Sequence, residues 1–192
     1  MIASLIHAPQ DKLYACGEGP DYDRSCWNDV KEKLDFDFPN LPYYMDGRVS
    51  ITQSNAILRY IAAQHGLIGT TEAEQANCME MQDVAMDFRN AAVRLFYNRR
   101  NYEEAKSKYL SSYLPTTLKR FETRLSKHAW FCGENLTFVD FVLYELIDQV
   151  GFRFHTHRDT PDAYTLLACT IGCQLCIGLS EGSSFPSSLQ SA

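Results

Sequence analysis

Residues 38–55 read Phe-Pro-Asn-Leu-Pro-Tyr-Tyr-Met-Asp-Gly-Arg-Val-Ser-Ile-Thr-Gln-Ser-Asn, and this stretch decides the fold of the chain. Residues 43–45 have strong β character, and residues 48–51 alternate polar and apolar side chains as a half-buried strand does. Between them, Asp46-Gly47 predicts a two-residue hairpin turn, because both central residues of such a turn need a positive φ. The stretch is therefore expected to form a β-hairpin that follows a proline-anchored turn.

A helix is expected directly after this hairpin, over residues 54–64. Ser54 precedes apolar residues at helical spacing, and His65-Gly66 is typical of a helix C-cap. The N-terminus of a helix presents free backbone N–H groups and the positive end of the helix dipole. Its position beside a strand edge therefore suits the binding of a carboxylate, although the Ser54 hydroxyl can also serve simply as an N-cap.

The residues before the hairpin are expected to add a strand and a helix. Residues 12–16 favour a strand, and residues 2–6 can pair with it only as an antiparallel hairpin, because so few residues separate the two. Residues 21–33 begin with aspartates and carry Lys31 and Lys33 near their end. This order of charges predicts a short helix.

After a linker at residues 67–70, the chain becomes all-helical. Thr71-Glu-Ala-Glu74 fits a capping box, and the helix that it begins is expected to run to about residue 97. A second helix is expected over residues 102–126, where Pro115 predicts a kink or a displaced start. The order of elements, a βα part followed by helices only, indicates two domains.

The later helices are expected to bury one apolar face each. In residues 102–126 this face consists of Leu110, Leu114, Leu118, Phe121 and Leu125. Thr137-Phe-Val-Asp140 resembles a second capping box, and the predicted buried side of its helix consists of Phe138, Phe141, Val142 and Leu146. Residues 152–159 have no helical period, and the Ser-rich residues 180–192 are expected to be disordered.

Composition excludes several classes of protein. The 192 residues are 45% apolar and 22% charged, which is ordinary for a globular protein. The net charge of −6 argues against a nucleic-acid partner, and no run of about 18 apolar residues predicts a membrane span. The first residues lack the features of a signal peptide, and seven scattered cysteines predict reduced thiols and a cytoplasmic protein.

Residues 38–63 carry a resemblance to a known family. The pattern Phe-Pro-Asn-Leu-Pro-Tyr-Tyr followed by Thr-Gln-Ser-Asn-Ala-Ile-Leu-Arg-Tyr-Ile-Ala resembles the glutathione-binding part of the cytosolic glutathione transferases, and the mu class most closely. The resemblance runs from about Pro20 to Val150. It implies an incomplete α/β thioredoxin-like domain at residues 1–66, an all-α helical bundle at residues 71–150 and a divergent tail at residues 151–192.

The same resemblance implies a glutathione site. Asn40-Leu41-Pro42 supplies backbone groups, and the Leu41–Pro42 bond is cis in the family, so that it exposes the preceding N–H and C=O to the cysteinyl part of glutathione. Gln53 and Ser54 match the positions that hold the γ-glutamyl carboxylate at the helix N-terminus. Arg24, Trp27 and Lys31, spaced to share one helical face, match the residues around the glycyl end.

Three further residues match family positions outside that pocket. Asp87 matches an aspartate that reaches the γ-glutamyl amine of glutathione bound by the other subunit. Phe38 matches an aromatic residue that inserts between helices of the partner subunit, which implies a homodimer. Tyr97 matches a tyrosine of the second-substrate site, where it orients or protonates the electrophile.

The chain departs from the family pattern at both ends. Mu-class enzymes carry a tyrosine after the first strand, in a Gly-Tyr-Trp-Asp-Ile-Arg-Gly segment, and its hydroxyl favours the glutathione thiolate. That segment is absent here, so no catalytic residue is assigned, and Tyr14 is not given the role. Without such a donor a thiol returns to a pKa of about 8.5. The first βα unit and the last family helices also have no counterpart, as in an incomplete version of a longer transferase.

The function implied is conjugation of glutathione to apolar, electrophilic xenobiotics, with glutathione as co-substrate and without a cofactor or metal. One alternative is a protein that binds glutathione or another ligand without turnover. Another is a redox protein that uses Cys16 or Cys26. The tail spacing Cys169, Cys173, Cys176 resembles an iron–sulfur motif of radical S-adenosylmethionine enzymes, or a zinc site completed by His155 or His157, but is expected to be an ordinary Cys-containing stretch.

Overall fold

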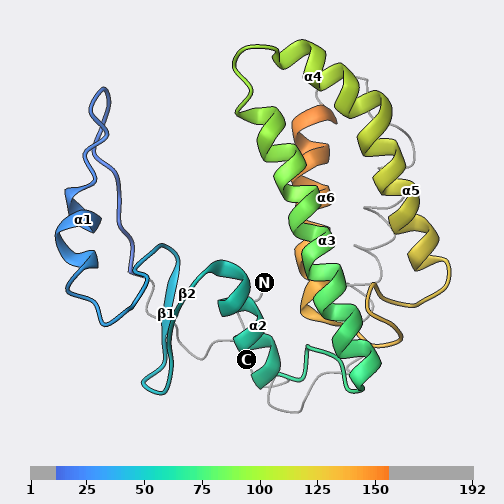
Figure 1. The fold of residues 1–192 in the computed structure, drawn as a ribbon, viewed down its shortest axis with the longest axis horizontal. Helices are drawn as coiled ribbons and strands as arrows, with labels where there is room; N and C mark the ends of the chain where they lie inside the picture. The colour runs from blue at the N-terminus through green and yellow to red at the C-terminus, as the bar shows by residue number, and fades with distance from the viewer. Residues whose placement is uncertain (1–11, 156–192) are drawn as a thin grey trace. The chain divides into compact units, whose positions relative to one another are not determined.

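The computed structural model describes residues 12–155, and the chain divides into two compact units, Met1–His65 and Gly66–Ala192. We call them unit 1 and unit 2. Among the described residues, unit 1 holds one antiparallel hairpin and two helices, and the long elements of unit 2 are all helices (Figure 1). The division follows the change in sequence character at the linker.

Unit 1 consists of α1 (Ser25–Lys31), β1 (Tyr43–Met45), β2 (Ser50–Thr52) and α2 (Ser54–Gln64). The two strands pair with Tyr43 opposite Thr52 and Met45 opposite Ser50. The predicted strand at residues 12–16 is wrong, because residues 12–18 have no regular structure. A strand needs a partner for its backbone groups, and none lies beside this segment among the described residues. The proposed pairing with residues 2–6 lies outside the described residues.

Helix α1 starts later than the sequence pattern predicted. Its first residue is Ser25, and Asp23 lies just before it. The Asp23 carboxylate accepts hydrogen bonds from the Ser25 backbone N–H at 2.9 Å and from the Ser25 hydroxyl at 2.6 Å. A carboxylate in this position competes with the helix for the backbone donors, so that a turn forms first and the helix begins only at Ser25.

The hairpin turn lies one residue later than predicted. The Asp46 N–H donates to the Val49 carbonyl at 3.2 Å, which makes Gly47 and Arg48 the central residues, and of these only Gly47 has a positive φ, 82°. The Asp46 carboxylate accepts from the backbone N–H groups of Arg48 and Val49, and these bonds hold its pKa at about 2. Asp46 is therefore the first residue of the turn, where a side-chain acceptor is favoured.

Helix α2 has the bounds that the sequence predicted. It is followed by the C-cap His65 and by Gly66 at φ 69°, a conformation that glycine adopts without strain. At its start the N-cap position is taken by Gln53, and Ser54 is the first helical residue. The interpretation of Ser54 as an N-cap is therefore wrong. Tyr60 on α2 donates to the Asp46 carboxylate at 2.9 Å and ties the helix to the hairpin turn.

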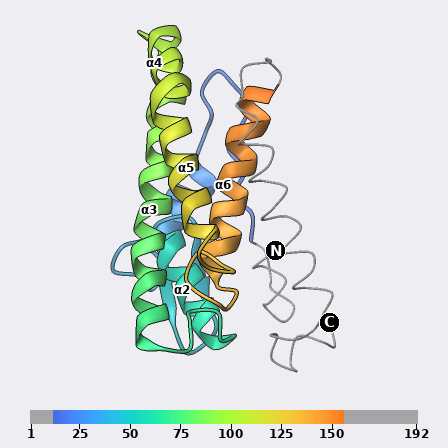
Figure 2. The same cartoon turned by 90° about the vertical axis from the view of Figure 1, so that its right-hand side faces the viewer.

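Unit 2 is built around three long helices that lie side by side in both views (Figures 1 and 2). Its elements are α3 (Glu72–Phe96), α4 (Tyr102–Lys108), the π-helical segment η2 (Tyr109–Tyr113), α5 (Leu114–Leu125) and α6 (Phe138–His155). The predicted helix over residues 102–126 is thus interrupted, as Pro115 indicated. Proline lacks an N–H and clashes with the preceding turn, and here it lies in the first turn of α5, directly after the π-helical segment.

The core of unit 2 centres on a run of aromatic rings. Phe88 of α3 meets Phe121 of α5 edge to face at 5.7 Å, and Phe121 meets Phe131 at 5.6 Å. Leu114 and Leu118 of the predicted stripe are also buried. Replacing one of these large side chains by alanine is the kind of change that costs about 3–5 kcal/mol in a well-packed core.

The prediction for the last helix needs two corrections. Its buried face consists of Phe138, Val139, Leu143, Ile147, Val150 and Phe154, whereas Phe141, Val142 and Leu146 are only half-buried. The helix also continues past the expected end to His155. The reason is tertiary, because the Phe154 ring lies 5.9 Å from those of both Phe96 and Tyr109. The Cys169, Cys173 and Cys176 tail lies outside the described residues.

The capping box at the start of α3 is confirmed. The Thr71 hydroxyl accepts from the Glu74 N–H at 3.1 Å, and the Glu74 carboxylate accepts from the Thr71 N–H in return. The same carboxylate accepts from the Thr70 N–H and hydroxyl and from the Asn135 amide, each at 2.8 Å. These donors, the Thr70 N–H foremost, lower the pKa of Glu74 from 4.5 to about 2.

Unit 2 is expected to become less stable as the pH is lowered, because the Glu74 carboxylate then becomes protonated. A carboxyl whose folded pKa is depressed stabilises the fold above its unfolded pKa, here 4.5, and the contribution is lost as the pH falls toward about 2. Glu74→Gln should therefore flatten the dependence of the urea midpoint on pH in this window. The control is Glu72→Gln, an exposed glutamate of the same turn. Equal slopes for both variants and the unchanged chain would refute the assignment.

No helix of residues 12–155 is long and apolar enough to cross a membrane.

Candidate functional site

Four aromatic side chains of unit 1 form a cluster, which consists of Tyr14, Trp27, Phe36 and Tyr43. The Trp27 ring stacks on that of Tyr43 with centroids 6.2 Å apart and meets the Tyr14 ring edge to face at 5.1 Å. The Phe36 ring also packs against Tyr43, with the two ring centroids 5.4 Å apart. The cluster connects α1 to β1, so that the predicted glycyl-end residues and the predicted backbone site belong to one packed body.

The cluster contains a pair of phenols that the sequence pattern did not indicate. The Tyr14 and Tyr43 hydroxyls lie 3.1 Å apart and share a hydrogen bond. This bond lowers the pKa of Tyr14 and raises that of Tyr43, and Lys12, whose ammonium lies 5.3 Å from the Tyr14 ring, lowers the pKa of Tyr14 further. No spacing rule links residues 29 positions apart, so only the fold could reveal the pair.

Trp27 and Lys31 lie on α1 as predicted, one turn apart. Lys31 is in the last turn, with its ammonium 3.8 Å from the Glu32 carboxylate, a loose and exposed pair. Arg24 is the N-cap residue rather than a member of the helix, and it is exposed. The three side chains thus come from one short element, and both cations are accessible to an anionic ligand.

The Asn40-Leu41-Pro42 segment enters β1 through a cis peptide bond between Leu41 and Pro42, which confirms that expectation. The Leu41 N–H donates to the Asn40 side-chain carbonyl at 2.9 Å. This backbone donor therefore already has an acceptor, in an exposed position where a peptide ligand can exchange with it. All three residues are exposed.

Gln53 has a backbone conformation that non-glycine residues rarely adopt, with φ 74° and ψ 113°. Such a conformation costs about 1–3 kcal/mol and persists where the surroundings determine it. Here the preceding Thr52 hydroxyl donates to the Phe38 carbonyl at 2.9 Å, while the Gln53 carbonyl accepts the first α2 bond from Ile57. The Gln53 side chain makes no capping bond, and Ser54 is exposed beside it.

The two other predicted residues belong to unit 2. Asp87 lies on α3 with its side chain exposed, and its backbone carbonyl accepts from the Tyr113 hydroxyl at 3.5 Å. It borders a cavity of about 570 Å³ between α3 and α5. Tyr97 is the C-cap of α3, and its side chain is 79% exposed. Phe38 of unit 1, the predicted interface residue, is 78% exposed.

The thiols of the described residues divide into two exposed and two buried groups. Cys16 and Cys26 are exposed and free, and the Cys26 thiol donates to the Ala15 carbonyl at 3.0 Å. Cys78 and Cys132 are buried and share a hydrogen bond, which lowers the pKa of Cys78 and raises that of Cys132. Within residues 12–155, no three His, Cys, Asp or Glu side chains are grouped so as to hold a metal ion.

Two family models match the chain. The glutathione S-transferase N-terminal domain matches residues 10–63, and the glutathione S-transferase C-terminal domain matches residues 86–170. Together they cover more than half of the chain. The second match extends beyond residue 150, where the sequence resemblance was expected to end.

Sequence relatives and solved structures agree with these matches. The chain is 57% identical over 140 residues to glutathione S-transferase Mu 5 of Rattus norvegicus and 54% identical over 140 residues to glutathione S-transferase Mu 3 of Homo sapiens. Each alignment covers 73% of this chain and 61% of the relative, so the chain spans about three fifths of the relatives' length. The glutathione S-transferase Blo t 8 superposes with a TM-score of 0.68 at 28% identity, covering 88% of this chain and 74% of that one.

A Pi-class glutathione S-transferase of Onchocerca volvulus shares the fold, with a TM-score of 0.64 at 24% identity over 82% of this chain and 78% of that one. The matched domains and the sequence relatives indicate the same family. The cis-proline hairpin and the helix that follows it agree with this assignment. The chain belongs to the glutathione S-transferase family, and its sequence is similar to the Mu class.

Proposed function

We propose that the chain is a glutathione transferase, in which the sulfur of glutathione attacks an electrophilic carbon and adds to it or displaces a leaving group. The observation that carries the proposal is the structure of residues 40–54 in unit 1. A cis-proline segment, a strained Gln53 and the start of α2 follow one another there, and α1 with its cations packs against the same strand through Trp27. These features supply backbone groups for a peptide and positive charge for its carboxylates.

The proposed roles follow from the chemistry of glutathione, which carries two carboxylates. Ser54, with the α2 amides and dipole behind it, binds the γ-glutamyl carboxylate together with Gln53. The Trp27 indole N–H and the cations Arg24 and Lys31 bind the glycyl carboxylate. The cysteinyl backbone pairs with Leu41, where it takes over the donor that Asn40 now engages. The protein then contributes mainly by orienting the thiol toward the electrophile.

Lys31→Ala is expected to weaken glutathione binding by about 10–100-fold, because a hydrogen bond to a charged group contributes roughly 1.5–3 kcal/mol. Ser54→Ala should show a loss of similar size. Titration calorimetry with glutathione measures both. The matched control is Lys33→Ala, an exposed lysine just beyond the end of α1, which should bind as the unchanged chain does. Equal affinities for Lys31→Ala and Lys33→Ala would contradict the site.

Turnover needs its own experiment, because binding of glutathione does not by itself show conjugation. The purified full-length chain is assayed for conjugation of a chlorinated dinitrobenzene and for retention on glutathione resin. Conjugation above the rate without protein supports the transferase. Retention without conjugation would instead support a glutathione-binding protein, and full activity after alanine replacement of Cys16 and Cys26 would remove the redox alternative.

We also propose that the chain is a cytoplasmic homodimer that acts in detoxification on apolar electrophiles. Phe38 of one subunit would enter the 570 Å³ cavity between α3 and α5 of its partner, whose lining includes Val84 and Phe121. Asp87 borders that cavity and would reach the glutathione of the other subunit. The exposed Tyr97 would contact the electrophile. Free thiols at all four described cysteines fit a reducing compartment.

A further inference from the structure

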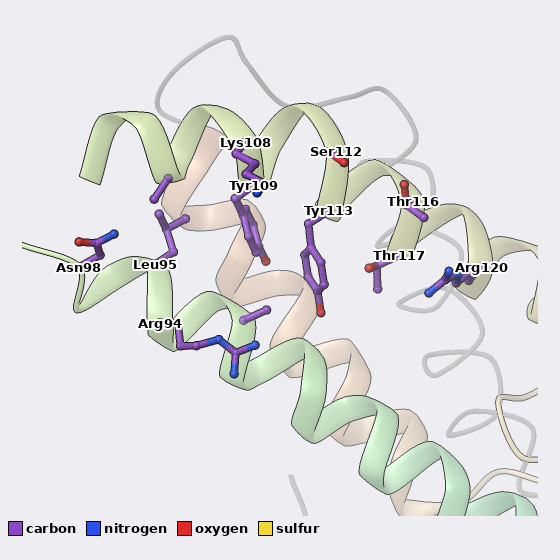
Figure 3. A pocket seen from close by; sticks show the side chains of 12 residues that line it. Arg94, Leu95, Asn98, Lys108, Tyr109, Ser112, Tyr113, Thr116, Thr117 and Arg120 are labelled. Carbon is purple, nitrogen blue, oxygen red and sulfur yellow. The ribbon is translucent and has the colours of Figure 1, made fainter. Parts of the chain in front are cut away.

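A second and larger cavity in unit 2 has no role in the proposed reaction. It has a volume of about 700 Å³ and lies between α3 on one side and α4, η2 and α5 on the other (Figure 3). Its lining contains three cationic side chains and no aspartate or glutamate. A cavity of this volume is in the range of small-molecule sites.

The three cations come from three different elements, and all three residues are exposed. Arg94 projects from α3, Lys108 from α4 and Arg120 from α5. Within the described residues none of them forms an ion pair or a side-chain hydrogen bond. The adjoining 570 Å³ cavity shares Arg94 and Arg120 and adds Asp87 together with Arg124, which pairs with Glu80 at 3.6 Å. Positive charge therefore predominates along this side of the bundle, and an anion would relieve the mutual repulsion.

Tyr109, which is among the residues that line the same cavity, has a buried hydroxyl. Tyr109 is only 5% exposed, and its hydroxyl is buried without a hydrogen-bond partner among the described residues. Buried hydroxyls almost always have a partner, so this one is an exception that requires an explanation. Burial also raises the pKa of this phenol, which keeps it protonated and able to donate. In Figure 3, Tyr109 and Tyr113 project side by side from the helix toward α3.

The π-helical segment explains why these groups gather. Segment η2 begins at Tyr109 and ends at Tyr113, and both rings lie on the cavity side with centroids 5.3 Å apart at 31°. Further hydroxyl donors follow on the same wall, at Ser112, Thr116 and Thr117. Short π-helical segments within α-helices occur frequently at functional sites. The wall therefore combines the half-buried ring of Tyr113 with a row of hydroxyl groups, on the side of the cavity opposite Arg94.

We propose that this cavity binds a small aromatic phosphomonoester of about the size of a nucleoside monophosphate. Guanidinium groups present planar forks that match phosphate oxygens, and Arg94 and Arg120 supply two of them from opposite walls. The hydroxyls and Lys108 complete the donor set. The half-buried ring of Tyr113 accepts the flat body of the ligand. This site lies wholly within unit 2 and does not depend on the glutathione site of unit 1.

The experiment is titration calorimetry of the full-length chain with adenosine 5′-monophosphate, in the presence of saturating glutathione. Saturable binding of one nucleotide per chain is expected, with adenosine and inorganic phosphate both binding at least tenfold more weakly. Failure of the nucleotide to bind, or phosphate binding as tightly as the nucleotide, overturns the proposal. Retention of the chain on glutathione resin is measured separately, so that loss of one site is distinguished from loss of the other.

Two variants test the assignment of residues. Arg94→Gln with Arg120→Gln is expected to weaken nucleotide binding at least tenfold, while Arg89→Gln, an exposed arginine on α3 outside the lining, leaves it unchanged. Tyr109→Phe removes only the buried hydroxyl. It should therefore raise the thermal midpoint of the free chain and yet weaken the binding of the nucleotide. Equal affinity in the arginine variants, or tighter binding by Tyr109→Phe, overturns the site.

Discussion

Replacement of Asp140 by alanine is expected to destabilise unit 2 by about 3–5 kcal/mol, because it strands two buried backbone N–H groups that this carboxylate satisfies. Asp140 lies at the start of α6 and is 1% exposed. It accepts hydrogen bonds from the backbone N–H groups of Phe131 and Thr137 and from the Thr137 hydroxyl, each at 2.8 Å. Burial raises the pKa of this carboxyl, and the three donors oppose that shift.

The two N–H groups carry most of the expected loss. The Thr137 hydroxyl keeps the Cys132 sulfur at 3.2 Å as another acceptor, whereas within residues 12–155 the N–H groups of Phe131 and Thr137 have only the Asp140 carboxylate as a side-chain acceptor. Each stranded buried donor costs roughly 1–3 kcal/mol. The same bonds fasten the loop that holds Phe131 against Phe121, so the loss reaches the core.

Urea unfolding followed by far-ultraviolet circular dichroism measures this effect. Asp140→Asn keeps one acceptor oxygen and should fall between the alanine variant and the unchanged chain. The matched control is Asp83→Ala, an exposed aspartate on α3 that makes no hydrogen bond or ion pair with the part of the chain that the structure describes, and it is expected to change stability by less than about 0.5 kcal/mol. A stability for Asp140→Ala within that same range would show that the buried network is not what holds the loop.

Replacement of Phe38 by alanine is expected to weaken the proposed homodimer by about 30–1,000-fold, the range of an interface hot spot worth about 2–4 kcal/mol. Its ring is 78% exposed in the single chain, which is unusual for so large an apolar side chain. The segment that carries it is fixed, because the Phe38 carbonyl accepts from the Thr52 hydroxyl at 2.9 Å. An exposed aromatic ring on a fixed segment suits insertion into a partner.

Sedimentation equilibrium of the unchanged chain and of Phe38→Ala measures the association constant directly. Leu13→Ala is the matched control, since Leu13 is also a large apolar residue of unit 1 and is 88% exposed, yet has no proposed partner. The dimer should persist in that control. A monomeric unchanged chain, or a Phe38→Ala dimer as tight as the control, would refute the interface.

Local rules predicted the elements that local chemistry governs. The bounds of α2, the capping box of Thr71 and Glu74 and the interruption near Pro115 were all read correctly. Each depends on residues only a few positions apart, so that a glycine after a helix or a proline within one has nearly the same consequence in any fold. The family resemblance, which extends the same logic to a whole pattern, identified the cis Leu41–Pro42 bond.

Predictions failed where distant residues decide the outcome. Residues 12–18 have strand-like composition but no strand beside them among the described residues, so they pack through Tyr14 onto Trp27 and Tyr43 instead. The hairpin turn is an exception with a local cause, because the Asp46 carboxylate accepts from the backbone N–H groups of Arg48 and Val49, two and three positions later. The end of α6 moved to His155 because Phe154 packs against α3 and η2.

For the candidate sites, too, the sequence determined some features and the tertiary structure decided others. Residues 38–55 by themselves determined the family, the hairpin, the helix after it and the expected ligand, because a backbone-binding site for a peptide is encoded in a contiguous pattern. Only the tertiary structure showed that Trp27 packs on the strand beside it, that Tyr14 and Tyr43 share a hydrogen bond, and that three cations line a cavity beside Tyr109. Those features join residues far apart in the chain, and packing, not local preference, brings such residues together.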